Sequence, residues 1–256
     1  MLYPMLQRAE VRADELIDLF NLQETNSISA AHDTISIGAM CTYTDILNET
    51  NVQIPALLRT AASTITGGPQ LRNQGTVGGS ACYANPSSDI PSVLVALGAT
   101  LHLASETGNR YVAASDFFVG PFVTSRHVDE ILVKIVINHD RGDETWGRYK
   151  LKTAGGSWPT GVAAARLRPD PIGSGATVVV TLGALTETPV ELASLRLSDC
   201  TTVSPTEQAQ IQAIISDANP RWWSDELADA DYRSRVASTV ATRAISAAIT
   251  QRKSND

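Results

Sequence analysis

Cysteine and histidine are too scarce in this chain, and too scattered, to build a metal centre. The 256 residues include three cysteines and four histidines. The cysteines form no Cys-x-x-Cys pair, and no two histidines stand at the spacing of zinc ligands. The sequence therefore predicts neither a disulfide framework nor a metal site. It also lacks the cysteine set that an iron–sulfur cluster requires.

Long hydrophobic runs and clusters of basic residues are absent as well. No apolar stretch reaches the ~18 residues typical of a membrane span. The first twenty residues carry charges early and contain no continuous apolar core, so they do not resemble a secretory signal. The formal net charge is −7, which disfavours binding to nucleic acid. We therefore expect a cytoplasmic protein that binds neither nucleic acid nor metal.

The length of the chain fits one large domain or two modest ones. Its content of 43% hydrophobic and 18% charged residues is typical of a globular protein. The most polar segment, at 138–145, is a candidate linker. We expect one domain over residues 1–140 and a second over 146–256. The mixture of helices and strands predicts an α+β fold.

Hydrophobic periodicity and end signals predict the individual elements. In the first part, helices are expected at 4–9, 42–50, 55–64 and 89–99, and strands at 15–22, 34–40, 100–105, 110–115 and 131–137. In the second part, strands are expected at 146–153, 160–169 and 175–185, and helices at 205–218 and 231–251. Ser204 and Glu207 have the spacing of a capping box at the start of the first of these helices.

The segment at 67–99 carries more glycine than a core needs. It contains two Gly-Gly pairs, at 67–68 and 78–79, before a polar entrance to a helix at Asp89. Paired glycines permit positive φ and let backbone amides approach an anion, and a helix N-terminus also favours one. This combination suits a nucleotide pyrophosphate. The alternative is a glycine-rich turn before an ordinary capped helix, since the spacing matches neither the Rossmann motif nor the P-loop.

Residues 70–99 resemble the second flavin-binding segment of the FAD-binding (medium) subunits of the molybdenum hydroxylases, the xanthine dehydrogenase and carbon monoxide dehydrogenase family. The family pattern is Q-x-R-N-x-G-T-[IV]-G-G-[NS]-x-x-x-x-x-P-x-x-D-x-P. It is matched by Gln70, Arg72, Asn73, Gly75, Thr76, Val77, Gly78, Gly79, Ser80, Pro86, Asp89 and Pro91. Segments at 114–137, 149–167, 182–192 and 230–245 also resemble the family, so the resemblance spans about residues 1–250.

The resemblance implies a fold in two parts. The first is an FAD-binding domain of the vanillyl-alcohol-oxidase (PCMH) type, made of two small α/β subdomains. The second is a C-terminal domain of the carbon monoxide dehydrogenase flavoprotein type, with a three-stranded antiparallel sheet and a helical bundle.

The sequence departs from the family pattern at its start. Family chains begin with a further A-G-G-x-[ST]-L loop that also holds the pyrophosphate, and this sequence begins where that loop ends. Either the start codon is misplaced or the form is truncated, and a truncated form would bind FAD weakly.

The function implied is that of an oxidoreductase subunit. It would bind FAD and pass electrons from partner iron–sulfur clusters to an external acceptor, for which NAD, oxygen and a quinone stay open. The implied partners are a large molybdopterin-binding subunit and a small [2Fe–2S] subunit, in a hetero-oligomer such as a dimer of heterotrimers. The alternative is a truncated, flavin-free chain that only docks to its partners.

The resemblance assigns cofactor-binding residues but no catalytic side chain and no metal ligand. The expected FAD-binding residues are Arg72, Asn73, Thr76, Val77, Gly78, Gly79, Ser80, Ala81, Pro86, Ser88, Asp89, Lys150 and Trp158.

Several of these residues have a second interpretation. Asp89 is expected either to cap a helix or to accept a hydroxyl of the ribityl or ribose chain. Lys150 either stabilises negative charge on the reduced flavin or is a surface lysine. Trp158 either stacks on the flavin or fills the core between domains. Trp222 and Trp223 are expected to form a partner-facing patch or a satellite core under the bundle.

Overall fold

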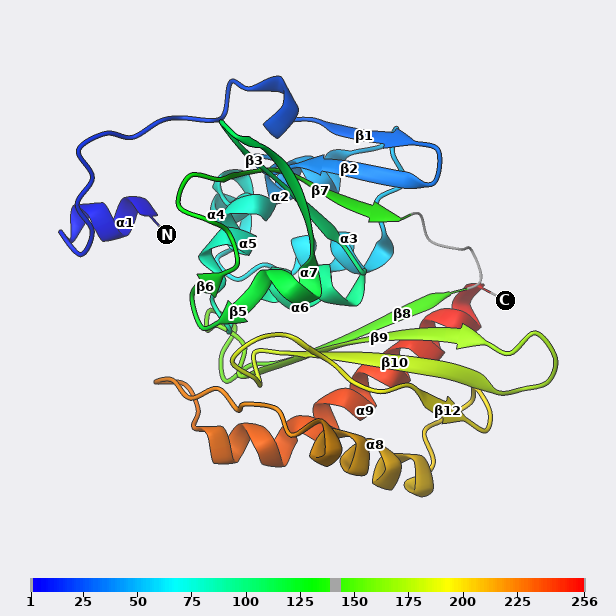
Figure 1. The fold of residues 1–256 in the computed structure, drawn as a ribbon. Helices are drawn as coiled ribbons and strands as arrows, with labels where there is room; N and C mark the ends of the chain where they lie inside the picture. Colours follow the sequence, from blue (N-terminus) through cyan, green and yellow to red (C-terminus); the bar gives the residue numbers. More distant parts are fainter. Residues whose placement is uncertain (1, 139–143, 256) are drawn as a thin grey trace.

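The computed structural model describes residues 2–138 and 144–255, which form two units on either side of a buried helix (Figure 1). Five of the eight residues of the expected linker at 138–145 lie outside the described residues, and Asn138 and Thr145 at its two ends belong to strands, so the exact domain boundary stays a prediction. No helix among the described residues is long and apolar enough to cross a membrane.

The first unit is built on a five-stranded antiparallel sheet in the order β1-β2-β7-β3-β4. Its strands are β1 (Ile28–Ala31), β2 (Thr34–Gly38), β3 (Thr100–Ser105), β4 (Gly108–Ala113) and β7 (Ile131–Asn138), with a separate hairpin of β5 (Phe118–Gly120) and β6 (Val123–Thr124). Its helices are α1 (Leu2–Gln7), the 3-10 turn η1 (Gln23–Thr25), α2 (Tyr43–Asn48), α3 (Ala56–Ser63), α4 (Gly68–Gln74), α5 (Val77–Tyr83), α6 (Asp89–Ala96) and α7 (Ala114–Phe117). Figure 1 shows most of these helices between the sheet and the second unit.

Alternation along the strands gives this sheet one buried face. Because side chains of a strand point alternately to its two faces, apolar residues two apart share one side. On β2, β3 and β7 the apolar residues that are no more than 1% exposed are Ile35, Ile37, Leu101, Leu103, Ile135 and Ile137. They form a single core with the helices.

The expected strand at 15–22 is wrong. These residues belong to no helix or strand, and Leu16, Ile17 and Phe20 are exposed. Their apolar pattern is strand-like, but a strand also needs a neighbour for its backbone hydrogen bonds, and none of the described strands pairs with it. The edge strand is β1 instead, which pairs with β2.

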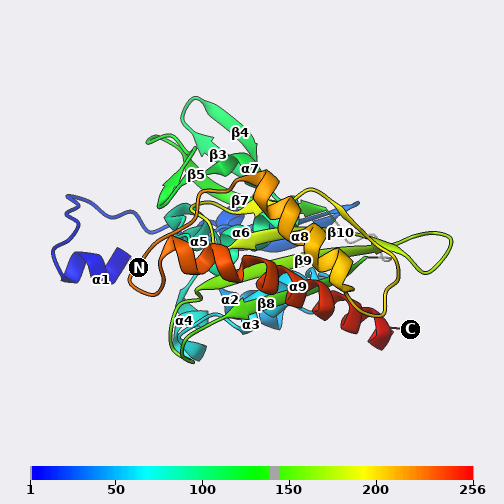
Figure 2. The ribbon, with the colours of Figure 1, turned by 90° about the horizontal axis from the view of Figure 1, so that it is seen from below.

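The second unit is an antiparallel sheet covered on one face by two helices. Three long strands, β8 (Thr145–Leu151), β9 (Gly161–Pro169) and β10 (Ala176–Gly183), form the expected sheet, and the short β11 (Val190–Glu191) and β12 (Leu195–Leu197) extend it along β10. Helices α8 (Pro205–Ala218) and α9 (Ala230–Asn255) pack against this sheet, as the view from below shows (Figure 2). The approach of α9 is close at Gly147, where a Cβ would lie 2.0 Å from the carbonyl oxygen of Ala244.

Helix α6 joins the two units. All eight of its residues are buried, because the helices of the first unit cover one side and the second sheet covers the other. Contact with β10 is tight at Gly183, where a Cβ would lie 2.4 Å from that of Ser92. Next to it, the amide of Ala184 donates to the carbonyl of Pro86 at 3.1 Å. The residues that precede α6 therefore lie at the seam between the units.

Candidate functional site

The two glycine pairs of the 67–99 segment differ in conformation. Gly67 and Gly68 adopt positive φ, at 101° and 69°, and lead into α4. Gly78 and Gly79 lie in the first turn of α5 and do not have positive φ. The positive φ that paired glycines permit therefore occurs at the first pair and not at the second.

Close packing explains the second pair. A Cβ on Gly78 would lie 2.5 Å from the Cβ of Ala39, and one on Gly79 would lie 2.6 Å from Oγ1 of Thr76. The amides here also have protein acceptors. Gly78 donates to the Ala39 carbonyl at 2.9 Å, Gly79 to Oγ1 of Thr76 at 3.0 Å, and Ser80 to the Thr76 carbonyl at 3.1 Å. That they face a pyrophosphate stays a prediction.

Neighbouring residues of the segment hold it in place. Val77 and Ala81 are completely buried. The hydroxyl of Ser80 is hydrogen-bonded to that of the buried Tyr43, and burial raises the pKa of Tyr43 to about 12. Both groups are therefore neutral hydroxyls near neutral pH, and the Ser80 side chain is directed inward at the base of α5.

Arg72 and Asn73 lie on α4, at the surface of the first unit. The guanidinium of Arg72 donates to the Ser63 carbonyl at 2.8 Å, and the hydroxyl of Thr44 donates to Oδ1 of Asn73. These contacts tie α4 to the ends of two neighbouring helices. A role for Arg72 and Asn73 toward a cofactor stays a prediction.

Asp89 does not cap α6, so that interpretation is wrong. Ser88 occupies the cap position, makes no side-chain capping bond, and Asp89 is the first helical residue. The Asp89 side chain is 3% exposed and is paired on one oxygen with Arg148 and on the other with Lys150, whose Nζ is 2.7 Å from Oδ2. Each oxygen thus already contacts a cation from the second unit. A ribityl or ribose hydroxyl could donate to Asp89 only at an oxygen that also holds one of these cations.

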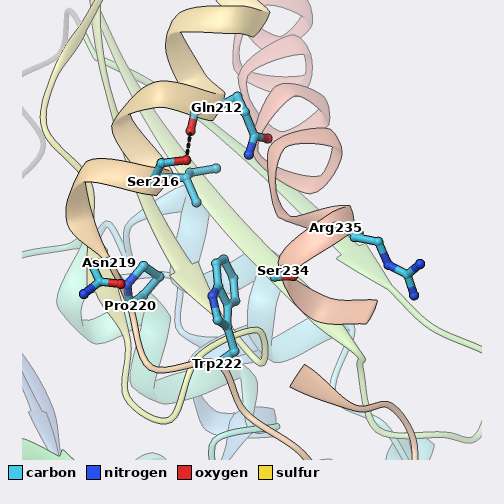
Figure 3. A pocket seen from close by; sticks show the side chains of 8 residues that line it. Gln212, Ser216, Asn219, Pro220, Trp222, Ser234 and Arg235 are labelled. Atoms are coloured by element: carbon cyan, nitrogen blue, oxygen red, sulfur yellow. Dashed lines mark hydrogen bonds between the residues drawn. The ribbon is translucent and has the colours of Figure 1, made fainter. Parts of the chain in front are cut away.

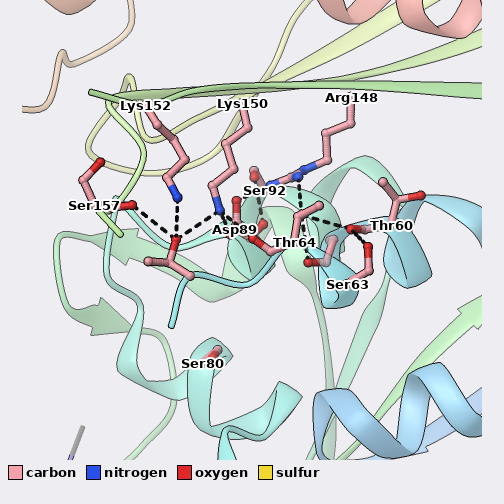
Figure 4. Close-up of polar contacts among 12 residues, drawn as sticks. Thr60, Ser63, Thr64, Ser80, Asp89, Ser92, Arg148, Lys150, Lys152 and Ser157 are labelled. Atoms are coloured by element: carbon pink, nitrogen blue, oxygen red, sulfur yellow. Dashed lines mark hydrogen bonds and ion pairs between the residues drawn. The ribbon is translucent and has the colours of Figure 1, made fainter. Parts of the chain in front are cut away.

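A row of cations on and just after β8 points toward the Asp89 side of the seam (Figure 4). Arg148 and Lys150 alternate along β8, and Lys152 follows directly after the strand ends at Leu151. We call these three residues the cationic row. The Nζ of Lys150 also donates to the Thr64 carbonyl at 3.1 Å, and Lys152 reaches the Thr66 hydroxyl at 3.4 Å. Lys150 is only 10% exposed, so its interpretation as a surface lysine is wrong.

The cationic row carries more positive charge than its protein partners neutralise. Among the described residues, Asp89 is the one carboxylate paired with it. The Nε of Arg148 is buried without a hydrogen-bond partner. Burial lowers the pKa of Lys150 from its ordinary value, because desolvation outweighs the attraction of Asp89. An anionic or electron-rich ligand at this seam would relieve that imbalance.

Trp158 lies in the loop between β8 and β9 and is 39% exposed, so its interpretation as a core residue is wrong. It lines a cleft of about 490 Å³ together with Phe122, Trp223, Asp225, Glu226 and Leu227, among others, and we call this the aromatic cleft. Stacking of Trp158 on a flavin stays a prediction.

Sequence reasoning missed several residues at this seam. Arg148 stands two positions before Lys150 on the same strand, so strand alternation could have identified it. Asp225 accepts from the Ser87 hydroxyl at 3.0 Å, from Nε1 of Trp223 at 2.9 Å and from the buried Arg233 at 2.8 Å. No local sequence pattern marks the contact of Asp225 with Ser87, because these residues are 138 positions apart.

The two adjacent tryptophans separate in the structure. Trp223 faces the aromatic cleft, whereas Trp222 packs against the core of the second unit, as the satellite-core interpretation expects. Trp222 also lines a pocket of about 290 Å³ between the ends of α8 and α9, near Pro220 and Arg235 (Figure 3). None of the expected cofactor-binding residues lines that pocket.

Known proteins similar to this chain match its first unit alone or almost its whole length. The family described as "FAD binding domain in molybdopterin dehydrogenase" matches residues 1–139. The carbon monoxide dehydrogenase medium chain of Hydrogenophaga pseudoflava is 31% identical over 252 residues, which is 96% of this chain and 86% of that one. The glyceraldehyde dehydrogenase medium chain of Sulfolobus acidocaldarius is 38% identical over 154 residues. That match covers 60% of this chain and 55% of the relative.

The fold agrees with these matches. A solved structure of the Hydrogenophaga pseudoflava carbon monoxide dehydrogenase, in a form that lacks the Mo-pyranopterin moiety of the molybdenum cofactor, superposes with a TM-score of 0.85 at 28% identity. The superposition covers 98% of this chain and 87% of that chain. The expected α+β architecture is confirmed.

Proposed function

This chain belongs to the family of FAD-binding domains in molybdopterin dehydrogenases, and from that premise we propose that it passes electrons from the iron–sulfur clusters of a partner to an external acceptor. FAD binding and membership of an oxidoreductase complex follow from the family. The partners proposed are a large molybdopterin-binding subunit and a small iron–sulfur subunit. The medium chains of carbon monoxide and glyceraldehyde dehydrogenase support this assignment by similarity.

The observation that carries the proposal is the excess of positive charge at the seam. Arg148 and Lys150 on β8, with Lys152 just after the strand, lie near a single carboxylate at the start of α6, and Nε of Arg148 has no hydrogen-bond partner. Buried cations are expensive unless they are paired. The set of donors therefore fits FAD, whose pyrophosphate is anionic and whose ring system becomes electron-rich on reduction.

Two groups of residues would hold FAD. At the start of α5, Gly79 is the exposed member of the second glycine pair, so a ligand would approach the backbone there, whereas the space beside Gly78 is filled by Ala39. Across the seam, Lys150 and Trp158 would border the ring system. When bound, FAD supplies the reversible electron transfer, and the residues described here bind it, orient it and set the charge around it.

Asp89 has a different role from the one expected. Its two carboxylate oxygens hold Arg148 and Lys150, so it is a positioning residue. An ammonium fixed in this way has fewer rotamers to lose when a ligand binds, which preorganises the site. The positive charge of Lys150 would stabilise the reduced flavin more than the oxidised one.

Copurification tests the proposed partners. A tagged form of the full chain, isolated gently from cells that carry its native operon, is expected to retain two further polypeptides. One should contain [2Fe–2S] clusters and the other molybdopterin, both measurable by metal analysis and absorption. Recovery of this polypeptide alone at every salt concentration would contradict the heteromer.

A further inference from the structure

The start of α5 is held by the residues that lead into α2. The amide of Val77 donates to the carbonyl of Cys41 at 3.1 Å, and the amide of Tyr43 donates to the carbonyl of Gly75 at 3.2 Å. These bonds join two segments that lie far apart in the sequence. They fix the backbone where it enters α5.

The side chain of Tyr43 contacts both ends of the stretch from Gly75 to Ser80. Tyr43 is only 3% exposed. A Cβ on Gly75 would lie 2.8 Å from Cε2 of the ring, so the ring packs directly against the backbone there. At the other end, the Tyr43 hydroxyl is hydrogen-bonded to that of Ser80. One buried side chain therefore spans the stretch that exposes Gly79.

Tyr43 is itself anchored as the first residue of α2. The capping box of this helix fixes its start, since the Asp45 amide donates to Oγ1 of Thr42 at 3.1 Å and the Thr42 amide donates to the Asp45 carboxylate at 2.8 Å. Among the described residues, no other group is hydrogen-bonded to the hydroxyl of Tyr43 or of Ser80. Burial raises the pKa of Tyr43 to about 12, so the bond does not titrate near neutral pH.

A ligand at the exposed backbone of Gly79 depends on where that backbone lies. Groups that bind a ligand must be held within about 0.5 Å of their productive geometry. A site that is fixed before binding also loses less conformational freedom when the ligand arrives. The hydrogen bond between Tyr43 and Ser80 supplies such a constraint directly beside Gly79, from a buried side chain.

We propose that Tyr43 is a positioning residue of the FAD site, which acts through Ser80 to fix the backbone from Gly75 to Ser80 before FAD binds. The inference rests on the proposed placement of FAD at the start of α5. It also gives the Ser80 hydroxyl a different role from the one expected, because this group holds the turn from within and does not contact FAD.

A double-mutant cycle on FAD affinity tests the proposal in the full chain. Tyr43→Phe keeps the ring against Gly75 and removes only the hydroxyl, whereas Ser80→Ala removes the same hydrogen bond from its other side. Each should raise the dissociation constant of FAD by about fivefold, the change typical of one neutral hydrogen bond. The double variant should bind no more weakly than either single variant, because both remove the same interaction. Flavin fluorescence measures all four dissociation constants.

Ser204→Ala is the structural control. The Ser204 hydroxyl accepts from the Glu207 amide and caps α8, on the face of the second sheet away from α6 (Figure 1), so its loss should lower the free energy of unfolding. FAD affinity should stay unchanged in this control. Urea unfolding without FAD measures the stability of each variant. If Tyr43 served stability alone, Tyr43→Phe would behave like Ser204→Ala.

Unchanged FAD affinity in folded Tyr43→Phe, or additive losses in the double variant, would overturn the inference. If Tyr43→Phe does not fold by circular dichroism, Ser80→Ala decides alone, and wild-type affinity in that variant would overturn it. These results differ from failure of the proposed function, in which the wild type itself would bind no FAD and this inference would lose its basis.

Discussion

The ammonium nitrogen of Lys150 lies 2.7 Å from Oδ2 of Asp89, and this buried ion pair joins the two units of the chain. Asp89 begins α6 in the first unit, and Lys150 lies on β8 in the second. A buried ion pair is seldom the most stabilising choice at such a position. We infer that the pair is there to hold a cation at the seam where FAD is proposed to bind.

Asp89→Asn should destabilise the fold strongly. The substitution leaves both Arg148 and Lys150 buried without a carboxylate, and breaking a buried pair typically costs about 3–5 kcal/mol. Lys150→Gln removes one cation and leaves Asp89 paired with Arg148, so it should lower the free energy of unfolding by less than Asp89→Asn does. Urea unfolding of the two variants measures the difference. A larger loss for Lys150→Gln would refute this description of the cluster.

Gly78→Ala should destabilise the first unit. The new Cβ would lie 2.5 Å from the Cβ of Ala39, and forcing extra atoms into a packed core typically costs about 1–3 kcal/mol. Gly156→Ala is the matched control, since a Cβ there meets nothing within 4 Å. The free energy of unfolding, measured in urea, should fall in the first variant and stay unchanged in the second. Equal stability of the two would show that α5 is free to move away from Ala39.

Local signals were sufficient to predict much of the architecture. Thr42 and Asp45, like Ser204 and Glu207, form capping boxes at the starts of α2 and α8. The expected helix over 42–50 begins at this first box, and the alternating segments became β3, β7 and the three long strands of the second unit. These features depend on residues close in sequence, so a pattern can reveal them.

Contacts between distant segments could not be predicted in this way. Arg148 and Asp89 are 59 positions apart, and Ser87 and Asp225 are 138 apart. At Gly78 the sequence indicates a close approach to the backbone but not what approaches it, and only the position of Ala39 shows that it is another part of the chain. The family resemblance singled out Lys150 as a candidate flavin-binding residue but did not predict its ion pair with Asp89.

Acid should weaken the fold through Glu130. Its hydrogen bonds with the Arg110 guanidinium lower the pKa of Glu130 from 4.5 to about 2. A folded-state pKa below the unfolded value means that the stabilisation is complete above pH 4.5 and is lost as the pH falls toward about 2. Melting temperatures across this window should fall less steeply for Glu130→Gln than for the wild type. The exposed Glu106→Gln is the control, and an unchanged slope for Glu130→Gln would contradict the assignment.

Lys150→Met should lower the midpoint potential of the bound flavin. A cation near the ring favours the more negative, reduced form, so its loss should shift the potential by roughly 30 mV for each tenfold loss of preference. Lys150→Arg keeps the positive charge and should have a midpoint potential close to that of the wild type. Lys253→Met, on α9 far from the seam, should leave the midpoint potential unchanged. A spectroelectrochemical titration measures all four proteins. Equal potentials for wild type and Lys150→Met would place Lys150 outside the flavin environment.

The central claim is that the start of α5 belongs to an FAD site in this chain. The most direct test is a titration of FAD, followed by flavin fluorescence, into the wild type, Gly79→Val and the control Gly156→Ala. A Cβ on residue 79 would lie 2.6 Å from Oγ1 of Thr76, so valine displaces the first turn of α5 and covers its exposed backbone. Each charge-assisted hydrogen bond to the ligand that is lost in this way is worth about 1.5–3 kcal/mol, and each ~1.4 kcal/mol is tenfold in affinity. We predict that wild type and Gly156→Ala bind FAD alike and that Gly79→Val binds it at least roughly tenfold more weakly while remaining folded by circular dichroism. Equal dissociation constants for folded Gly79→Val and wild type would contradict the account.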